Sequence, residues 1–461
     1  MLMHEPSCVE VNLTAIDHNM AAIRRLVGSE CKLCPIVKAD AYGLGAARVA
    51  RRLVAAGADL LAVYSLPQAA ELAGVVGSGP GPGPGTGLGP GETSRGAPAV
   101  LVLMPVADIR PGDETSRMLT SGRLHLTVHD LGQLEVLASL ADHYQTRIPI
   151  HLEVDSGLSR GGARPEEAGR LLERIAADAQ ARQRFHLRGV FTHFANSRVD
   201  RDATDGQLAR FDELLSRYAH TLAADTEIHV ASTYALFRHR RYHRSMVRFG
   251  LAWAGYGLEE LDGGEMEIGN DVLRPCVRWR SRVVQVKRIP PGTAVGYGSR
   301  WVAKRPSTIG LVPVGYADGF PVFRPSEPDG GGDGESGQQK IAVLREVARG
   351  SRTEMVREFA PVIGAVNMDQ ITVDLTEVDC LTQRDGGVGM TVEIISPDAG
   401  APNHLPRLAG RSGMIPHEML CRIHPKIPRL YVVDGEMAEE PTAAPVSPAQ
   451  SAQSVARVAV G

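Results

Sequence analysis

Residues 124–128, LHLTV, are followed by LGQLEVLASLADHY (131–144) and then by IPIHLEV (148–154). The first and last segments are short apolar runs of the kind that form buried strands, whereas in the middle segment apolar residues recur every three or four positions. This alternation predicts a strand, a helix and a second strand parallel to the first, because a helical crossover brings the chain back to start a strand in the same direction.

The same unit repeats on both sides of this stretch. With the two strands above, the predicted strands lie at 33–37, 60–64, 99–103, 187–194, 226–231 and 245–250. Helical patterns separate most of them, for example at 205–222, and another helix is expected near 13–26 after the extended segment VEVNL. Eight βα units in about 250 residues predict an α/β fold with an N-terminal TIM (β/α)8 barrel, with an open doubly wound sheet as the alternative.

From residue 275 the pattern changes. Segments such as STIGLVPVGYA and APVIGAVNMDQITVDL are β-rich and separated by Gly/Pro turns, and helical periodicity returns only near HEMLCRI (417–423). We therefore expect a barrel over 9–265 and a mostly β C-terminal domain over 270–435. The remainder, 436–461, is biased to Ala, Pro, Ser and Gln and is expected to be a disordered tail.

Glycine and proline make up 80 of the 461 residues, and many of them fall in two segments. We interpret 75–97 and 325–340 as flexible surface insertions, because neither contains enough apolar residues to offset its ordering entropy. The first is not a dinucleotide-binding phosphate loop. Between Gly77 and Gly91 its glycines occupy only odd positions, and the intervening prolines lack the N–H groups that bind phosphate.

Composition excludes several classes of protein. A net charge of -3 disfavours a general nucleic-acid binder, and RHRRYHR (238–244) is better explained as a solvated barrel loop. No apolar run approaches the roughly 20 residues that span a bilayer, and the N-terminus lacks the pattern of a secretion signal, so we expect a cytoplasmic protein that binds no membrane. Six scattered cysteines indicate reduced thiols, and the lone C-x-x-C of Cys31 and Cys34 has no second pair to complete a metal site.

In a TIM barrel the active site forms where the strands end. Lys38 closes the first apolar run, and a desolvated lysine has a lowered pKa and becomes a nucleophile toward carbonyl groups. The alternative is a strand-end lysine whose ammonium group reaches solvent. Later strand ends carry further candidates, which are Glu153, Asp155, Arg160, His193, Ser232, Thr233 and Arg248.

This set of residues resembles the alanine racemase family, pyridoxal-phosphate enzymes with a barrel followed by a β domain. The strongest motifs are VKADAYGLG (37–45), MVRFG (246–250), VGYG (295–298) and VGYADG (314–319), in the order expected for the family. The resemblance runs from about Val9 to Tyr431 and is interrupted by the two Gly-rich insertions.

The resemblance implies the catalytic residues. Lys38 would bind pyridoxal 5'-phosphate covalently and act as one base, and Tyr297 of VGYG would be the other. Two bases on opposite faces of a planar carbanion are the most direct way to invert an α-carbon, while the cofactor withdraws electrons. Because tyrosine titrates near pH 10, a cationic neighbour must lower the pKa of Tyr297.

The resemblance also implies binding residues. Arg248 would face the pyridine nitrogen and His193 would lie beside the ring, although a buried core histidine is the alternative for His193. The phosphate contacts would be Tyr42, Thr233, the backbone of Gly250 and Leu251, and His417. The substrate contacts would be Arg160, Met368 and Tyr316, whereas Asp318 has a structural explanation.

Several positions depart from the family pattern. Glu153 occupies the place of a frequent carbamylated lysine, so its negative charge would balance Arg160, which would in turn polarise the Tyr297 phenol. His417 replaces a tyrosine at the entrance, Ser232 replaces an asparagine, and Asn367 replaces a frequent cysteine. The segment 250–258 is two residues longer than the common form.

Three functions remain open at this point. The first is alanine racemisation that supplies D-alanine for peptidoglycan. The second, suggested by the changes at the entrance, is racemisation of serine or of a broader set of amino acids. The third is a non-catalytic pyridoxal-phosphate protein, although such proteins generally lack the β domain. Resemblance to the family also implies a homodimer in which one subunit completes the active site of the other.

Overall fold

The computed structural model describes residues 6–77, 98–258, 273–322, 339–349, 352–378 and 387–438. The chain forms two compact units. The barrel unit comprises Asn12–Val277 and Pro397–Cys421, and the β unit comprises Met1–Val11, Arg278–Ser396 and Arg422–Gly461. Most of the segments predicted as insertions (75–97 and 325–340) and as a disordered tail (436–461) lies outside the described residues.

Parallel strands form the centre of the barrel unit. Their bounds are β2 (Lys32–Pro35), β3 (Leu60–Val63), β4 (Ala99–Val102), β5 (Leu124–Val128), β6 (Ile148–Glu153), β7 (Phe185–Phe191), β8 (Glu227–His229) and β9 (Met246–Phe249). Strands β3 to β8 pair in chain order, and β2 pairs with β9. Backbone hydrogen bonds from Val37 N to Ala62 O (2.9 Å) and from Ser245 N to Ile228 O (3.1 Å) join the two sheets on either side. The ring of strands therefore closes, and the predicted TIM barrel is confirmed.

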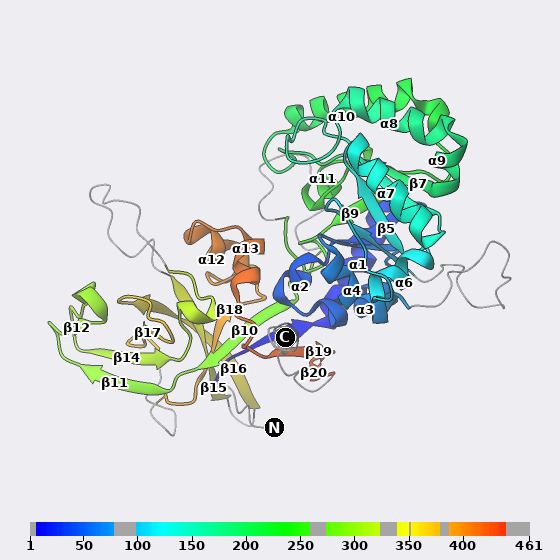
Figure 1. Cartoon of the computed structure of the whole chain (residues 1–461). Coiled ribbons are helices and arrows are strands. Elements are labelled where there is room, and N and C mark those ends of the chain that lie inside the picture. The colour runs from blue at the N-terminus through cyan, green and yellow to red at the C-terminus, as the bar shows by residue number, and fades with distance from the viewer. Residues whose placement is uncertain are drawn as a thin grey trace, which may run out of the picture. The chain divides into compact units, whose positions relative to one another are not determined.

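Helices such as α6, α7, α8 and α9 lie on the outside of the barrel strands (Figure 1). Helix α7, for example, begins after Asp130, whose side chain accepts a hydrogen bond from Gln133 N at 2.7 Å, and it packs Leu134 and Leu137 inward. The helices are α1 (Leu13–Val27), α3 (Ala46–Ala55), α4 (Leu66–Glu71), α5 (Ala73–Val76), α6 (Glu114–Thr120), α7 (Leu131–Tyr144), α8 (Pro165–Ala177), α9 (Ala179–Arg184), α10 (Arg201–Arg217), α11 (Thr233–Arg238), α12 (Leu405–Arg411) and α13 (Pro416–Arg422).

The β unit contains a long sheet whose strand pairs β10–β18, β15–β18, β15–β16, β16–β17, β14–β17, β11–β14 and β19–β20 are antiparallel. Its strand order is β11-β14-β17-β16-β15-β18-β10-β1-β19-β20. The strands are β1 (Cys8–Asn12), β10 (Val277–Arg282), β11 (Gln285–Ile289), β14 (Ser307–Val312), β15 (Lys340–Arg349), β16 (Arg352–Ile363), β17 (Ile371–Asp374), β18 (Thr391–Ile395), β19 (Arg429–Val433) and β20 (Glu436–Met437), with a separate pair β12 (Ala294–Val295) and β13 (Trp301–Val302). The predicted mostly β C-terminal domain is therefore confirmed, with β1 from the N-terminus added to its sheet.

Two sequence features receive structural explanations. In the basic stretch 238–244, Arg244 pairs with Asp212 of α10 at 2.7 Å and Arg241 pairs with Asp205 of the same helix. Burial raises the pKa of Cys31 to about 11 and that of Cys34 to about 12, so both remain thiols. Within the described residues, no group of three or more possible ligands could hold a metal ion.

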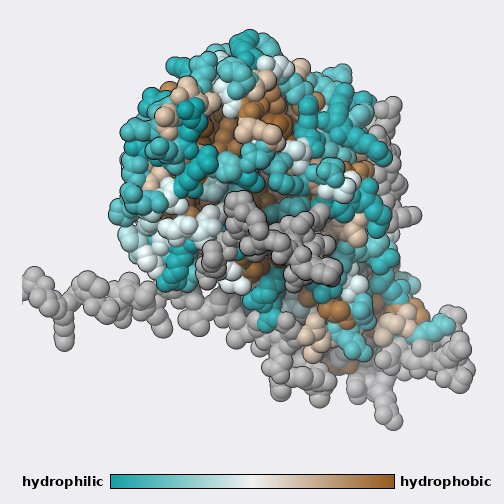
Figure 2. Space-filling view, turned by 90° about the vertical axis from the view of Figure 1, so that its right-hand side faces the viewer, coloured by the Kyte–Doolittle hydropathy of each residue, from teal (hydrophilic) through white to brown (hydrophobic). Residues whose placement is uncertain are grey.

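The outer surface agrees with this layered arrangement. Figure 2 shows hydrophilic residues over most of the visible face, with apolar residues in small separate groups. None of the described helices is long and apolar enough to cross a membrane.

Candidate active site

A pocket of about 900 Å³ lies where the barrel strands end, and it is lined by residues of the barrel unit. It brings together eight of the residues predicted to form the site, which are Lys38, Tyr42, Arg160, His193, Thr233, Arg248, Gly250 and His417. Leu251 follows Gly250 in the chain and is fully buried. The other three predicted residues, Tyr297, Tyr316 and Met368, belong to the β unit and are described there by themselves.

Lys38 lies at the start of a turn with an unusual backbone. In segment α2 (Lys38–Gly43), the residues Ala39 to Tyr42 have φ values of 53°, 55°, 52° and 60°, which is the left-handed helical region. This conformation costs about 1–2 kcal/mol per residue for residues other than glycine. Hydrogen bonds hold the turn, including those from Ala46 N to Asp40 Oδ1 (2.6 Å) and from Ala41 N to Val37 O (3.0 Å). Strain of this kind persists only where the surrounding structure enforces it, and it is concentrated at functional sites.

The amine of Lys38 is suited to act as a nucleophile. Nζ makes no hydrogen bond or ion pair with any described residue, although the side chain lines the pocket. Burial and then the cation of Arg160 lower the pKa of Lys38 from its ordinary value. Both effects disfavour the ammonium form, so a larger fraction of Lys38 is the neutral amine.

Tyr42 forms part of the pocket wall. Its ring stacks on Trp253 at a centroid distance of 5.7 Å and meets His417 edge-on at 5.2 Å. A Cβ at Gly250 would lie 2.2 Å from the Tyr42 hydroxyl oxygen, so this position requires glycine. The hydroxyl donates no hydrogen bond to a described residue and is therefore free to bind a ligand in the pocket.

The segment after β9 offers further polar groups. Thr233 Oγ1 accepts hydrogen bonds from Gly250 N at 3.1 Å and from Ala252 N at 3.4 Å. The N–H of Leu251, which lies between them in the chain, donates to no described residue, although Leu251 is fully buried. A buried N–H without an acceptor costs free energy, so this segment is prepared for an acceptor that a ligand would supply.

Arg248 is held rigidly at the base of the pocket. Nη1 donates to His229 O at 2.8 Å and to His229 Nδ1 at 2.7 Å, and Nη2 donates to Thr192 O at 2.7 Å. The guanidinium also lies over the ring of Phe191, 4.7 Å from its centroid. Burial lowers the pKa of Arg248 to about 10, which leaves it protonated at neutral pH. Nε has no partner among the described residues and remains available to a ring nitrogen.

Two histidines of the pocket are neutral at pH 7. Burial and the cations of Arg248, Arg160 and Lys38 lower the pKa of His193 to about 3. Burial and then Lys38 lower the pKa of His417 to about 4. Each ring therefore presents one donor and one acceptor without a charge.

Glu153 does not form the expected pair with Arg160. Its Oε2 lies 3.1 Å from His129 Nδ1, and His129 Nε2 lies 3.2 Å from Leu103 O. Both ring nitrogens of His129 therefore face an acceptor oxygen, one of a carboxylate and one of a carbonyl. Arg160 has no ion pair with any described residue. Sequence reasoning missed His129, and its position directly after the LHLTV strand was the available signal.

Tyr297, Tyr316 and Met368 are exposed on the β unit. Their exposed fractions are 78%, 47% and 54%. Backbone hydrogen bonds from Tyr316 N to Asn367 O and from Ala317 N to Met368 O, both 3.0 Å, place Tyr316 beside Met368. The β unit therefore presents large side chains that its own packing does not bury.

Comparison with known proteins agrees with this arrangement. Residues 11–258 match the family model of the alanine racemase N-terminal domain, and residues 276–431 match that of the alanine racemase C-terminal domain. The chain belongs to the alanine racemase family. It is 30% identical over 440 residues to alanine racemase 2 of Caldanaerobacter subterraneus subsp. tengcongensis, covering 94% of this chain and 96% of that protein.

Solved structures of the family share the fold. The alanine racemase from Streptomyces coelicolor A3(2) has a TM-score of 0.72 and 26% identity, covering 93% of this chain and 98% of that one. A second structure, the alanine racemase from Bartonella henselae with covalently bound pyridoxal phosphate, has a TM-score of 0.68 and 22% identity, covering 93% of this chain and 100% of that one.

The pocket residues fit a phosphorylated aldehyde of pyridoxal size. Lys38 offers an amine with a lowered pKa, and Arg248 offers an unused N–H at a fixed position. The free hydroxyl of Tyr42 and the unsatisfied N–H of Leu251 are donors of the kind that bind phosphate. This fit rests on the structure as well as on family membership, because these groups have no hydrogen-bond or ion-pair partner among the described residues.

Proposed function

We propose that this protein interconverts L-alanine and D-alanine with pyridoxal 5'-phosphate as cofactor, and that it supplies D-alanine for peptidoglycan. The observation that carries the proposal is Lys38, a half-buried amine without an ion-pair partner that lines the same pocket as the fixed Arg248. Membership of the alanine racemase family over both domains supports the choice of reaction.

Residues of the barrel unit would hold the cofactor. Lys38 would bind its aldehyde carbon, and Arg248 would donate its spare N–H to the ring nitrogen. Contacts to the phosphate would come from Tyr42, Thr233, Gly250, Leu251 and His417, with His193 beside the ring. Bound there, the cofactor would supply an electron sink that makes the α-hydrogen of the substrate acidic.

Two bases would move the α-proton. Lys38 Nζ would take or return it on one face of the α-carbon, and Tyr297 Oη would do so on the other. Arg160 and the backbone N–H of Met368 would bind the substrate carboxylate, and Tyr316 would contact the substrate from the same side. Arg248 cannot transfer its proton to an acceptor, so it would orient the ring without protonating it.

Racemisation and solvent exchange test the proposal together. The purified protein is incubated with L-alanine or D-alanine in D2O, and both the inversion and the incorporation of α-deuterium are followed by NMR. We expect the native protein to do both from either enantiomer, and Tyr297→Phe to lose inversion in both directions. Unchanged inversion in Tyr297→Phe would show that the two-base assignment is wrong, whereas no inversion by the native protein would refute the function.

A broader amino-acid racemase is the second candidate. It is favoured by His417 and Ser232, which both line the pocket and both depart from the family pattern. The test is kcat/KM for alanine, serine and larger amino acids. A ratio near one between alanine and serine would replace the first proposal with this one. A non-catalytic pyridoxal-phosphate protein is disfavoured by the match to the C-terminal domain.

We also propose that two subunits share each active site, with Tyr297 and Met368 reaching the pocket of the partner. Support comes from their exposure, 78% and 54%, on the β unit. The test mixes the inactive variants Lys38→Ala and Tyr297→Phe under conditions that exchange subunits. Shared sites predict recovery of about a quarter of the native activity, because half of the dimers would contain one intact site. No recovery despite exchanged subunits would place both residues in one chain.

A further inference from the structure

A second cavity, of about 470 Å³, lies where the barrel strands begin. The first residues of five strands line it, namely Lys32 of β2, Leu60 of β3, Ala99 of β4, Glu227 of β8 and Met246 of β9. The active-site pocket lies at the other ends of the same strands. None of the residues that line this cavity has a role in the function proposed above.

Three histidines connect the two cavities through the centre of the barrel. His229 Nε2 lies 3.1 Å from His151 Nδ1, and His151 Nε2 lies 3.0 Å from His125 Nδ1. His229 Nδ1 lies 2.7 Å from Arg248 Nη1, in the active-site pocket. At the opposite end, His125 lines the second cavity.

The proton positions along this chain follow from Arg248. A guanidinium only donates, so His229 Nδ1 must accept and the proton of a neutral His229 is on Nε2. By the same reasoning His151 and His125 each carry their proton on Nε2. All three rings are neutral at pH 7, because burial and neighbouring cations hold the pKa of His125 at about 3 and the pKa values of His151 and His229 well below the ordinary range.

Gly189 of β7 makes the central contact possible. It lies between β6 and β8, the strands that carry His151 and His229, and a Cβ at this position would be 2.3 Å from His151 Nδ1 and 2.8 Å from His229 Nε2. The hydrogen bond between the two rings therefore crosses a strand through a gap that only glycine leaves open.

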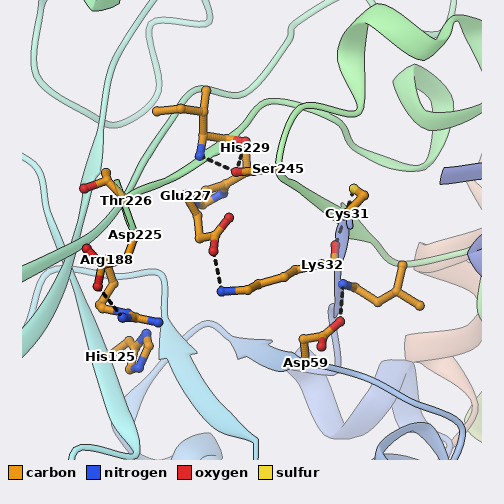
Figure 3. Close-up of polar contacts among 12 residues, drawn as sticks. Cys31, Lys32, Asp59, His125, Arg188, Asp225, Thr226, Glu227, His229 and Ser245 are labelled. Carbon is orange, nitrogen blue, oxygen red and sulfur yellow. Dashed lines mark hydrogen bonds and ion pairs between the residues drawn. The ribbon is translucent and has the colours of Figure 1, made fainter. Parts of the chain in front are cut away.

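The last donor of the chain, His125 Nε2–H, faces no acceptor among the described residues. His125 makes one hydrogen bond, through Nδ1 to His151. Figure 3 shows its ring together with the side chains of Lys32, Asp59, Arg188 and Glu227, all of which line the second cavity. A polarised chain that ends in a donor at a cavity favours a bound acceptor at this place.

The cavity carries excess positive charge. Of the described residues, four cations and two carboxylates line it, which are Lys32, Arg123, Arg147 and Arg188 against Asp59 and Glu227. Lys32 pairs with Glu227. Asp59 pairs with Arg24 and Arg188 pairs with Asp225, and both of these partners lie outside the lining of the cavity. The lining therefore holds more cations than carboxylates, which favours an anionic ligand.

We propose that this cavity binds a small oxyanion of the phosphate type, which accepts the Nε2–H of His125 between Arg147 and Arg188. The anion would complete a continuous row of hydrogen bonds that ends at Arg248. This proposal stands on the geometry of the cavity and does not depend on the racemase function.

Calorimetric titration with inorganic phosphate tests the proposal. The full-length protein with its cofactor is titrated at constant ionic strength in a chloride buffer, and sulfate is titrated in parallel. We expect saturable binding of both anions in the millimolar range. Arg147→Gln and His125→Phe should each weaken it at least about tenfold, because charge-assisted hydrogen bonds provide most of the affinity.

The matched control is Arg174→Gln. Arg174 is an exposed arginine that pairs with Glu135 and lies outside both cavities. It should bind phosphate like the native protein, and circular dichroism establishes that each variant is folded. Two outcomes overturn the proposal. One is the absence of saturable binding, and the other is binding that survives Arg147→Gln and His125→Phe but is lost in Tyr42→Phe, which would place the anion in the active-site pocket.

Discussion

Cationic side chains lie at both ends of the barrel, but the two ends differ in whether these cations pair with carboxylates. Where the strands end, Lys38, Arg160 and Arg248 have no carboxylate partner among the described residues, and Arg248 is held by neutral acceptors alone. Where the strands begin, Lys32 pairs with Glu227 and Arg188 pairs with Asp225 at 2.9 Å. Unpaired buried charge is costly, so the cations where the strands end need a ligand that balances them. Where the strands begin, two cations are already paired with carboxylates, so less positive charge is left for an anion.

Among the variants that test this difference between the two ends, we expect Lys38→Arg to have the largest effect. A guanidinium cannot lose its proton at any ordinary pH, so it can serve neither as nucleophile nor as base. We expect kcat to fall by at least about 10³-fold and the lysine-linked visible chromophore to be lost. The control Lys304→Arg, at an exposed lysine of the β unit, should retain both. A chromophore that remained in Lys38→Arg would contradict the assignment.

Gly189→Ala is the variant expected to disturb most strongly the row of histidines that connects the two ends of the barrel. The new methyl group would overlap His151 Nδ1, and overpacking of this kind costs about 1–3 kcal/mol of unfolding free energy. The control is Gly206→Ala in α10, where the nearest atom to a Cβ is Arg210 Nη1 at 3.7 Å and the change should stabilise by about 0.5–1 kcal/mol. Urea denaturation measures both, and equal stabilities for the two variants would show that the gap at Gly189 is not needed.

Tyr42→Phe tests the unsatisfied donors where the strands end. The ring can still stack on Trp253, but the hydroxyl that would bind phosphate is removed. A hydrogen bond to a charged group contributes about 1.5–3 kcal/mol, so we expect cofactor to dissociate roughly 10 to 100 times faster during dialysis. In the control Tyr144→Phe, the lost hydroxyl donates to Ile109 O at 2.6 Å, so stability should fall while cofactor retention is unchanged.

Arg160→Leu would remove a proposed contact to the substrate carboxylate and should raise KM, and the smallest effect that we expect in this series is its additional shift of the pH profile. Burial lowers the pKa of Lys38 first and the Arg160 cation lowers it further, so removing the cation raises that pKa. Less neutral amine is then present at a given pH, and the acidic limb of kcat/KM should move to higher pH. Arg174→Leu, an exposed arginine, should leave the limb where it is. A limb that moved to lower pH would contradict the electrostatic role of Arg160.

Much of the barrel could be predicted from local patterns. The helix expected at 131–144 is α7, and the apolar runs place Lys38, Thr233 and Arg248 at or beside strand ends in one pocket. These predictions succeed because burial and the helical repeat are written into neighbouring residues. The left-handed turn could not be predicted, since Ala39 to Tyr42 contain no glycine and their conformation is imposed by packing.

Contacts between segments that are distant in the chain also could not be predicted from the sequence. His125, His151 and His229 each look like an ordinary strand residue, and their hydrogen bonds depend on which strands are neighbours and on the missing side chain of Gly189. The partner of Glu153 is a second example. Its charge suggested Arg160, but the loop after β5 brings His129 to it at 3.1 Å. Which side chains pair with one another can therefore be learned only from the three-dimensional structure, even where the sequence predicts the fold.

The left-handed turn after Lys38 also has a consequence for assembly of the protein. Its four residues favour other conformations in an unfolded chain, so the turn depends on the packing of the folded barrel around Tyr42. Burial in that folded state is the main cause of the lowered pKa of Lys38. The lowered pKa of Lys38 is therefore a property of the folded barrel, whereas an unfolded chain would expose Lys38 as an ordinary ammonium group.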